Sequence, residues 1–258
     1  MYNSLQNQTA LVIGGTRGIG RSISTRLASE GVNLIINYHK SDDLANQTVI
    51  ECEKYGVNVK LIKADIGMPD DLKNIIDEII SLEKLDILIL NAAKGLERPR
   101  QAIEQKIGHL RSTLDTNVLG PWEIIKSSST VMKKSGGGTI IGLLTPGSHY
   151  YIDGYSAVAV SKAAFETLIK YTAVELASEN IQVNGVMSGL VEGTIGSKSF
   201  ENFLDKIAKI TPSGRNIKTE DVSNLVAWLC SNESKMIVGQ TINIDGGFTL
   251  ASWKNFQD

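Results

Sequence analysis

Short apolar runs alternate along the chain with longer segments in which apolar residues recur at helical spacing. The runs are almost continuously apolar, which is typical of strands buried on both faces of a parallel sheet. The segments between them, such as "GRSISTRLASEG" and "DDLKNIIDEIISLEK", have the period of amphipathic helices. The apolar runs predict seven strands: "TALVI" (9–13), "NLIIN" (33–37), "VKLIK" (59–63), "DILIL" (86–90), "GTIIGLL" (138–144), "IQVNGVM" (181–187) and "TINI" (241–244).

This alternation predicts right-handed crossovers and a doubly wound α/β fold with a seven-stranded parallel sheet. No linker, charge block, low-complexity tract or repeat interrupts the pattern, so we expect one domain over residues 1–258, with 1–135 as mainly the cofactor-binding half. The least regular stretch, residues 188–215, lies between the last two predicted strands. A long excursion at this place is expected to be a substrate lid.

Composition excludes several classes of function. The chain has 258 residues, a formal net charge of −2 and a sequence pI near 6.0, which gives no support for a nucleic-acid partner. Cys52 and Cys230 are too few for a disulfide framework and are expected to pack in a reducing compartment. His39, His109 and His149 have no ligand spacing, so no metal site is expected.

The first residues and the apolar runs give no sign of membrane targeting. The first residues, "MYNSLQNQTALVIGG", lack a basic segment followed by a long apolar one, so no signal peptide is expected. No apolar run approaches the length of a membrane span. We therefore expect a cytoplasmic protein with no membrane partner.

A glycine-rich turn, "GGTRGIG", follows the first predicted strand and opens a helical segment. Glycines let the backbone turn sharply and approach a pyrophosphate, and the helix that follows offers its first amides to the anion. This position in an alternating chain is typical of a Rossmann-like dinucleotide site. The residues of the turn expected at the cofactor are Gly14, Thr16, Arg17, Gly18, Ile19 and Gly20.

The end of the second strand indicates which dinucleotide is bound. An NAD-selective site usually places an acid here, yet "INYHKS" contains none before Asp42. Arg17, Lys40 and Ser41, next to Tyr38, would instead surround a ribose 2′-phosphate. The sequence therefore favours NADPH over NADH, the alternative being that Arg17 and Lys40 are solvated surface charges.

The segment "YSAVAVSK" contains a candidate catalytic pair. Two turns of a helix take about seven residues, so Tyr155 and Lys162 would share one helix face. A nearby ammonium favours the phenolate and moves the pKa of a tyrosine from near 10 toward working pH. Alternatively, these two residues are the edge of an ordinary amphipathic helix.

Together with these motifs, "KADI" (63–66), "LNAAKG" (90–95), "VNGVMSG" (183–189) and "GQTINIDGG" (239–247) resemble the short-chain dehydrogenase/reductase family over nearly the whole chain. The resemblance implies that Asn117 supports the lysine through a water relay and that Lys162 bonds the nicotinamide ribose. It also implies a nicotinamide or adenine contact for Asp65, Ile66, Asn91, Ala92, Ala93, Gly189, Val191 and Thr194.

The chain departs from the common family pattern at the catalytic residues. Val158 stands four residues before Lys162, where the family usually has its tyrosine, and Thr145 replaces the usual serine. Tyr155 lies seven residues before the lysine. This spacing, with "SG" for the usual "PG" and "TPSGR", resembles the NADPH-dependent type III enoyl-(acyl-carrier-protein) reductases of fatty acid biosynthesis, in which Tyr150 matches a second, auxiliary tyrosine.

The longer spacing has a physical reading. Conjugate reduction sends hydride to the β-carbon while charge develops on the thioester oxygen, so the proton donor stands farther from the nicotinamide than in ketone reduction. Moving the tyrosine three residues shifts it about 4.5 Å along a helix, if the helix extends that far. The leading prediction is therefore reduction of a 2-enoyl thioester, linked to acyl carrier protein or coenzyme A, with Tyr155, Lys162 and Asn117 catalytic and Tyr150, Thr145 and Tyr155 contacting substrate.

Two alternatives stay open. The first is a ketoreductase or dehydrogenase for a 3-oxoacyl or secondary-metabolite carbonyl, with Tyr155 reached by a rearranged helix start. The second is a non-catalytic NADPH-binding protein on the same fold. The resemblance further implies a homotetramer built on the helical segments 103–134 and 155–178.

Overall fold

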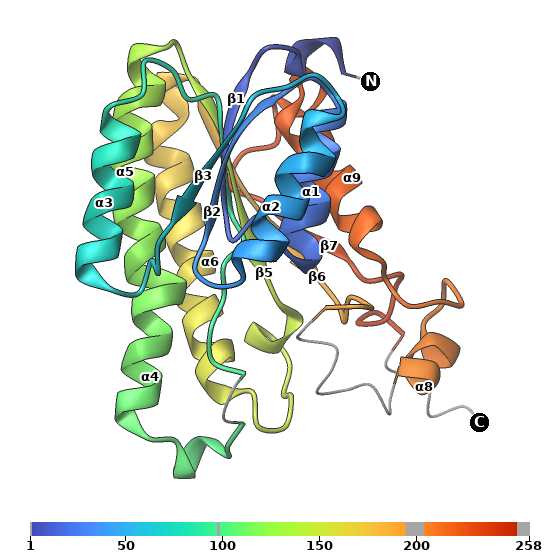
Figure 1. Cartoon of the computed structure of the whole chain (residues 1–258). Helices are drawn as coiled ribbons and strands as arrows, with labels where there is room; N and C mark the ends of the chain where they lie inside the picture. Colours follow the sequence, from blue (N-terminus) through green and yellow to red (C-terminus); the bar gives the residue numbers. More distant parts are fainter. Residues whose placement is uncertain (1, 97–98, 195–203, 252–258) are drawn as a thin grey trace.

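Seven parallel strands form one sheet in a computed structural model that describes residues 2–96, 99–194 and 204–251 (Figure 1). Their order is β3-β2-β1-β4-β5-β6-β7, so the chain reverses direction across the sheet next to β1. This arrangement confirms the predicted doubly wound fold. The strands are β1 (Thr9–Ile13), β2 (Asn33–Tyr38), β3 (Val59–Lys63), β4 (Ile87–Leu90), β5 (Gly138–Leu144), β6 (Ile181–Ser188) and β7 (Thr241–Ile244).

Helices cover both faces of the sheet. In Figure 1, α3, α5 and α6 lie on one face, and α1, α2 and α9 lie on the other. The helices α4 and α8 extend beyond the ends of the strands (Figure 1). The helices are α1 (Gly18–Ser29), α2 (Asp42–Glu53), α3 (Pro69–Ile80), α4 (Ile107–Leu114), α5 (Gly120–Lys134), α6 (Ser156–Leu176), α8 (Leu204–Ile210) and α9 (Thr219–Cys230).

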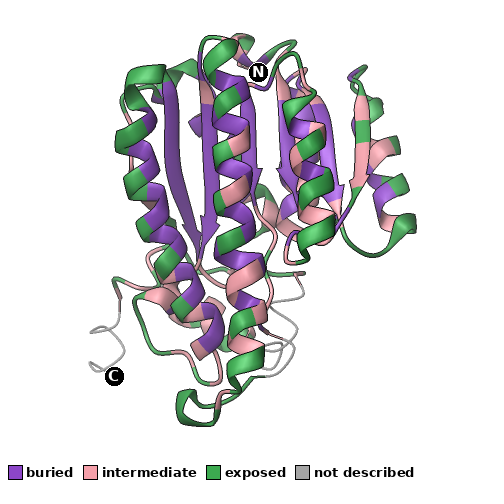
Figure 2. Cartoon of the chain, turned by 90° about the vertical axis from the view of Figure 1, so that its left-hand side faces the viewer, coloured by how far each residue is buried: buried purple, intermediate pink, exposed green. Residues whose placement is uncertain are grey.

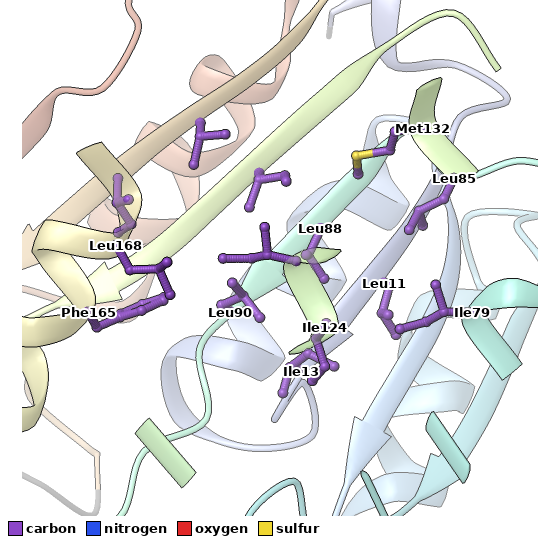
Figure 3. Close-up of a cluster of buried hydrophobic side chains, with 14 of the residues drawn as sticks. Leu11, Ile13, Ile79, Leu85, Leu88, Leu90, Ile124, Met132, Phe165 and Leu168 are labelled. Atoms are coloured by element: carbon purple, nitrogen blue, oxygen red, sulfur yellow. The ribbon is translucent and has the colours of Figure 1, made fainter. Parts of the chain in front are cut away.

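The apolar strands supply two cores, one on each side of the sheet. In β1, Leu11 and Ile13 pack on the side of α3, α5 and α6, whereas Ala10 and Val12 pack on the side of α1 and α9. Figure 3 shows the first of these cores, with strand residues beside Phe165 of α6. Side chains that alternate between two buried faces explain why the central strands are apolar at nearly every position.

The two outer strands differ from the prediction of burial on both faces. The outer strand β3 exposes Lys60 and Lys63, and no residue of β7 is fully buried. Figure 2 shows the contrast between the purple central strands and the mixed pink and green strand at one edge. An edge strand has one strand neighbour, and charged side chains on it block pairing with another chain.

Helix α6 packs directly against the backbone of β5 at Gly142, which has no side chain to hold the helix away. A Cβ at Gly142 would lie 2.6 Å from Cδ1 of Ile169 and 2.8 Å from Cε1 of Phe165. A glycine inside a strand commonly marks such a close approach of another element. The packing fixes α6 against the end of β5, where the candidate catalytic residues lie.

We expect Phe165→Ala to lower the free energy of unfolding by about 3 to 5 kcal/mol, because Phe165 is only 1% exposed and the cavity left under α6 cannot collapse fully. Thr167→Ala, on the exposed side of the same helix, is the matched control and should change it by less than about 0.5 kcal/mol. Urea denaturation of the three proteins measures both values. Equal stabilities would show that the α6–β5 contact does not support the fold.

Candidate active site

The glycine turn after β1 forms a tight cradle that is closed by Asn91, the residue directly after β4. Gly14 and Gly18 have φ angles of +74° and +50°, which favour glycine. The Asn91 side-chain amide donates to the Gly14 carbonyl oxygen at 2.8 Å. A Cβ at Gly20 would lie 2.0 Å from that oxygen and 2.6 Å from the Asn91 amide nitrogen. The first amides of α1 receive no side-chain hydrogen bond from Arg17, so they are available to an anion, and the turn fits a dinucleotide.

The acid that follows β2 is neutralised by its neighbours. Asp42 accepts from the Tyr38 hydroxyl at 2.8 Å and pairs with the Lys63 ammonium at 2.8 Å. The Lys63 ammonium, and then the Tyr38 hydroxyl, hold the pKa of Asp42 below its usual value. Arg17 and Lys40 are exposed, and neither takes part in an ion pair within the described residues. This edge of the turn thus carries unpaired positive charge, as the sequence predicts for a 2′-phosphate.

His39 is a residue of this edge that the sequence analysis set aside as one of three scattered histidines. Its Nδ1 lies 3.2 Å from Oδ2 of Asp65, the residue expected at the adenine, and its side chain is half exposed. The other carboxylate oxygen of Asp65 accepts from the backbone amide of Gly67 at 3.0 Å. The only sequence signal for His39 is its position directly after β2, next to Lys40.

The chain that follows β6 crosses toward the glycine turn. The amide of Gly189 donates to the Ile244 carbonyl at 3.2 Å, and the Thr194 hydroxyl donates to the Val191 carbonyl at 2.9 Å. A Cβ on Gly18 would meet Cγ2 of Thr194 at 3.6 Å. Thr194 is therefore brought to the cradle, whereas Gly189 and Val191 lie against Ile217. Residues 195–203 of the predicted lid lie outside the described residues.

Asn117 joins three elements of the site. It is fully buried in a π-helical turn (Asp115–Leu119) between α4 and α5. Its side-chain oxygen accepts from the Lys94 amide at 2.9 Å, and its nitrogen donates to the Lys94 carbonyl and to the Ser161 hydroxyl, each at 2.9 Å. π-Helical turns are frequent at functional sites. Asn117 holds the loop after β4 against α6, a role that its resemblance to a relay residue did not indicate.

Lys162 is buried beside the end of β5. Its ammonium donates to the Leu143 carbonyl oxygen at 2.7 Å and lies 5.3 Å from the centre of the Phe165 ring. Burial lowers the pKa of Lys162 from 10.5 to about 8. The side chain is 4% exposed, so the lysine is held in one position rather than sampling solvent.

Tyr155 and Thr145 bring two hydroxyl groups together. The Tyr155 hydroxyl donates to Oγ1 of Thr145, which follows β5, at 3.3 Å. The ring packs on Gly147, where a Cβ would come within 2.7 Å of it. Val158, at the position of the usual family tyrosine, is buried and lies against Gly95. The phenol beside the end of β5 is therefore that of Tyr155, and its hydroxyl partner is Thr145.

Two sequence-based expectations about Tyr155 need correction. Helix α6 begins at Ser156, so Tyr155 precedes its first turn and the proposed shift along a helix does not apply to it directly. Burial raises the pKa of Tyr155, offset in part by the Thr145 hydrogen bond, and Lys162 does not contribute. The ammonium of Lys162 points to a strand carbonyl instead of the phenol, which explains why the expected lowering is absent.

The two neighbouring tyrosines lie at the surface. Tyr151 is 81% exposed, and its hydroxyl donates to Gln101 and Asp153. Tyr150 is half exposed, and its ring centre lies 6.4 Å from that of His149. Within the described chain, no hydrogen bond joins Tyr150 to Thr145 or Tyr155, so its predicted substrate contact stays a prediction.

Two of the remaining predicted cofactor residues, Ile66 and Ala92, line a small void together with Asn117 and Lys162. The others are a buried Thr16, a half-buried Ile19, an exposed Ser41 with φ of +71° and an exposed Ala93.

The described ranges contain no group of three or more His, Cys, Asp or Glu side chains arranged to hold a metal ion. In these ranges, no helix is long and apolar enough to cross a membrane. Both cysteines are free and buried, and burial raises the pKa of Cys52 to about 11. They are packing residues of the core and not nucleophiles.

Comparison with known proteins gives consistent matches over nearly the whole chain. A family model described as "Enoyl-(Acyl carrier protein) reductase" matches residues 14–249. A 3-oxoacyl-(acyl-carrier-protein) reductase of Staphylococcus epidermidis is 34% identical over 95% of this chain and 100% of its own. A 1-cyclohexenylcarbonyl-CoA reductase of Streptomyces collinus is 29% identical over 98% of this chain and 91% of its own. A short-chain dehydrogenase from Burkholderia cenocepacia, solved in complex with NADP, has 30% identity, covers 96% of this chain and 100% of its own, and gives a TM-score of 0.87.

The buried ammonium of Lys162 predicts a pH-dependent stability. Its pKa is about 8 in the folded chain and near 10.5 when unfolded, so between these values the unfolded chain binds more protons and stability rises with pH. We expect Lys162→Met to be more stable than wild type below pH 8, with a difference that shrinks by up to about 3 kcal/mol as the pH approaches 10.5. Urea denaturation without cofactor from pH 7 to 10 measures it, and a difference independent of pH would contradict the assigned burial of the charge.

Proposed function

Because the chain belongs to the short-chain dehydrogenase/reductase family of oxidoreductases, we propose that it uses NADPH to reduce the 3-oxo group of an acyl thioester. The observation that carries this proposal is the contact between the Tyr155 and Thr145 hydroxyls. This contact serves an oxygen that gains negative charge in either reaction. The ketoreductase alternative of the sequence analysis is preferred to the leading prediction of enoyl reduction because the curated relatives at 33–34% identity are named 3-oxoacyl-(acyl-carrier-protein) reductases.

The two hydroxyls suit one carbonyl oxygen. The phenol and the threonine hydroxyl are 3.3 Å apart, so an oxygen placed between them can accept a hydrogen bond from each. Such donors are worth most where negative charge develops in the transition state. Tyr155 then gives its proton to that oxygen, and its raised pKa in the cofactor-free chain keeps the phenol protonated for this step.

Lys162 and Asn117 support the pair without touching the substrate oxygen. The ammonium of Lys162 is fixed at the Leu143 carbonyl, two residues before Thr145, where it can bind a ribose hydroxyl of the cofactor. Asn117 keeps the loop after β4 and the first turns of α6 in register through Lys94 and Ser161. These two residues are therefore proposed to orient the groups that react.

NADPH is proposed as the cofactor, and it supplies the hydride that is added to the carbonyl carbon. The turn at Gly14, Gly18 and Gly20 would hold the pyrophosphate, because Gly14 and Gly18 adopt positive φ angles and Gly20 lets the start of α1 pack against the Gly14 carbonyl. Arg17 and Lys40 would pair with a 2′-phosphate, since the nearby acid Asp42 is already bound to Lys63. The adenine would lie beside Asp65 and His39.

Enoyl thioester reduction is the second candidate, and one specific observation favours it. Tyr155 precedes Lys162 by seven residues, and the buried Val158 leaves no phenol at the usual position. The matching family description and the name of the Streptomyces relative both refer to reduction of an enoyl group. In that reaction the same hydroxyl pair would stabilise the enolate oxygen of the thioester.

We further propose that residues 1–258 form one domain and that the protein assembles as a homotetramer. Its substrates are proposed to be acyl groups linked to a carrier protein or to coenzyme A. Exposed large apolar side chains on the helices at 107–134 and 156–176 support self-association. They are Ile107, Leu119, Trp122, Val160, Tyr171 and Val174.

The decisive assay measures oxidation of NADPH, and of NADH in parallel, with acetoacetyl-CoA and with crotonyl-CoA. We expect faster turnover of acetoacetyl-CoA with NADPH, and a loss of at least about 100-fold in kcat for Tyr155→Phe, because the proton donor is removed. Tyr151→Phe, which removes a surface hydroxyl, is the matched control and should retain activity.

Preferential turnover of crotonyl-CoA would replace the main proposal by the second candidate. Tight binding of NADPH without turnover of either thioester would instead support a non-catalytic cofactor-binding protein. Full activity of Tyr155→Phe would remove Tyr155 from the mechanism in either reaction.

A further inference from the structure

We propose that Glu166 and His149 form a clamp that positions the Thr145–Tyr155 hydroxyl pair. The clamp is defined by the contact of His149 Nε2 with Glu166 Oε2 at 2.8 Å. Neither residue takes part in the chemistry described above, yet Glu166 is a carboxylate buried on α6, with 7% of its side chain exposed. The catalytic part of this inference rests on the proposed function.

The Glu166 carboxylate collects donors from three parts of the fold. Besides His149, the Lys170 ammonium lies 3.2 Å from Oε1, and the Thr241 hydroxyl of β7 donates to Oε1 at 3.2 Å. Burial raises the pKa of Glu166, but the hydrogen bonds from His149 and Lys170 outweigh it and lower the pKa below its usual value. A buried carboxylate that keeps its charge holds its hydrogen-bond donors in place, because losing a donor would leave part of the charge unpaired at a cost in free energy.

The His149 end of the clamp leads directly to the catalytic hydroxyls. His149 ends a short helical turn, Pro146–Ser148, and its backbone amide donates to the Pro146 carbonyl at 2.9 Å. Within the same turn, the Ser148 hydroxyl donates to the Thr145 carbonyl at 2.8 Å. Gly147 of this turn is the residue on which the Tyr155 ring packs. A displacement of the turn would therefore move Thr145 and release one side of the Tyr155 ring.

The far end of the loop is held independently of the clamp. Asp153 accepts from the Gln101 side chain, and the Arg100 amide donates to the Gly154 carbonyl at 3.3 Å. Loss of the His149 contact should thus free the turn at 145–149 without detaching residues 153–154. Glu166 also lies one helical turn after Lys162, so the clamp ties Thr145 to the helix that carries the lysine.

Three variants test this inference. His149→Ala removes the clamp, His149→Gln keeps a side-chain N–H donor of similar reach, and Lys170→Ala removes another, more exposed partner of the same carboxylate. The first readout is hydrogen exchange of the backbone amides of Ser148 and His149, which requires no substrate. The second is kcat for acetoacetyl-CoA and crotonyl-CoA, with the dissociation constant of NADPH as a control.

In His149→Ala, we expect exchange at both amides to be at least about tenfold faster and kcat to fall about tenfold or more, with NADPH binding unchanged. His149→Gln should restore both, and Lys170→Ala should resemble wild type.

Exchange in His149→Ala at the wild-type rate would overturn the clamp, as would equal effects of His149→Ala and Lys170→Ala. Faster exchange with an unchanged kcat would overturn its catalytic part. If wild type reduces neither thioester, the proposed function fails, and the exchange comparison still decides whether the clamp exists.

Discussion

The close contact between α6 and β5 is the constraint on which the site depends. Gly142 removes the side chain that would keep Phe165 and Ile169 away from the strand. At this separation, Lys162 reaches the Leu143 carbonyl, and the phenol just before the helix reaches the hydroxyl just after the strand. A larger residue at 142 would displace the helix, and the distances among the candidate catalytic side chains would change with it. The core and the chemistry are therefore parts of one packing arrangement.

Much of this architecture could be predicted from the sequence, because parallel strands buried on both faces are apolar throughout. Four predicted strands have the observed bounds, and the glycine turn lies where the order of strands reverses. The edge strands carried a signal that the prediction of burial on both faces did not use, since β3 (VKLIK) has two lysines and β7 (TINI) has an asparagine, whereas β4 (ILIL) is wholly apolar. Burial depends on which strands have two neighbours, and this is a property of the complete sheet.

The chemistry of the site was less accessible, because it depends on directions of side chains. The spacing of Tyr155 and Lys162 indicated a pair on one helix face, but the ammonium points to β5 and the phenol to Thr145. Likewise, nothing in the sequence links His149 with Glu166, which are 17 residues apart and meet only because the turn after β5 folds over α6. The resemblance to enoyl reductases rested mainly on the sequence spacing of Tyr155 and Lys162. The observed contact instead shows where the Tyr155 hydroxyl lies, beside the Thr145 hydroxyl. That end point, beside a second hydroxyl, suits a substrate oxygen on which negative charge develops.

A double-mutant cycle on kcat for acetoacetyl-CoA with NADPH tests most directly whether Thr145 and Tyr155 act on one oxygen. The cycle compares wild type, Thr145→Val, Tyr155→Phe and the double variant. If the two hydroxyls work as a unit, the double variant should be no more than about threefold slower than Tyr155→Phe alone, because the first deletion already breaks the pair. Losses that multiply in the double variant would contradict the account, since they would mean that the two residues contribute independently.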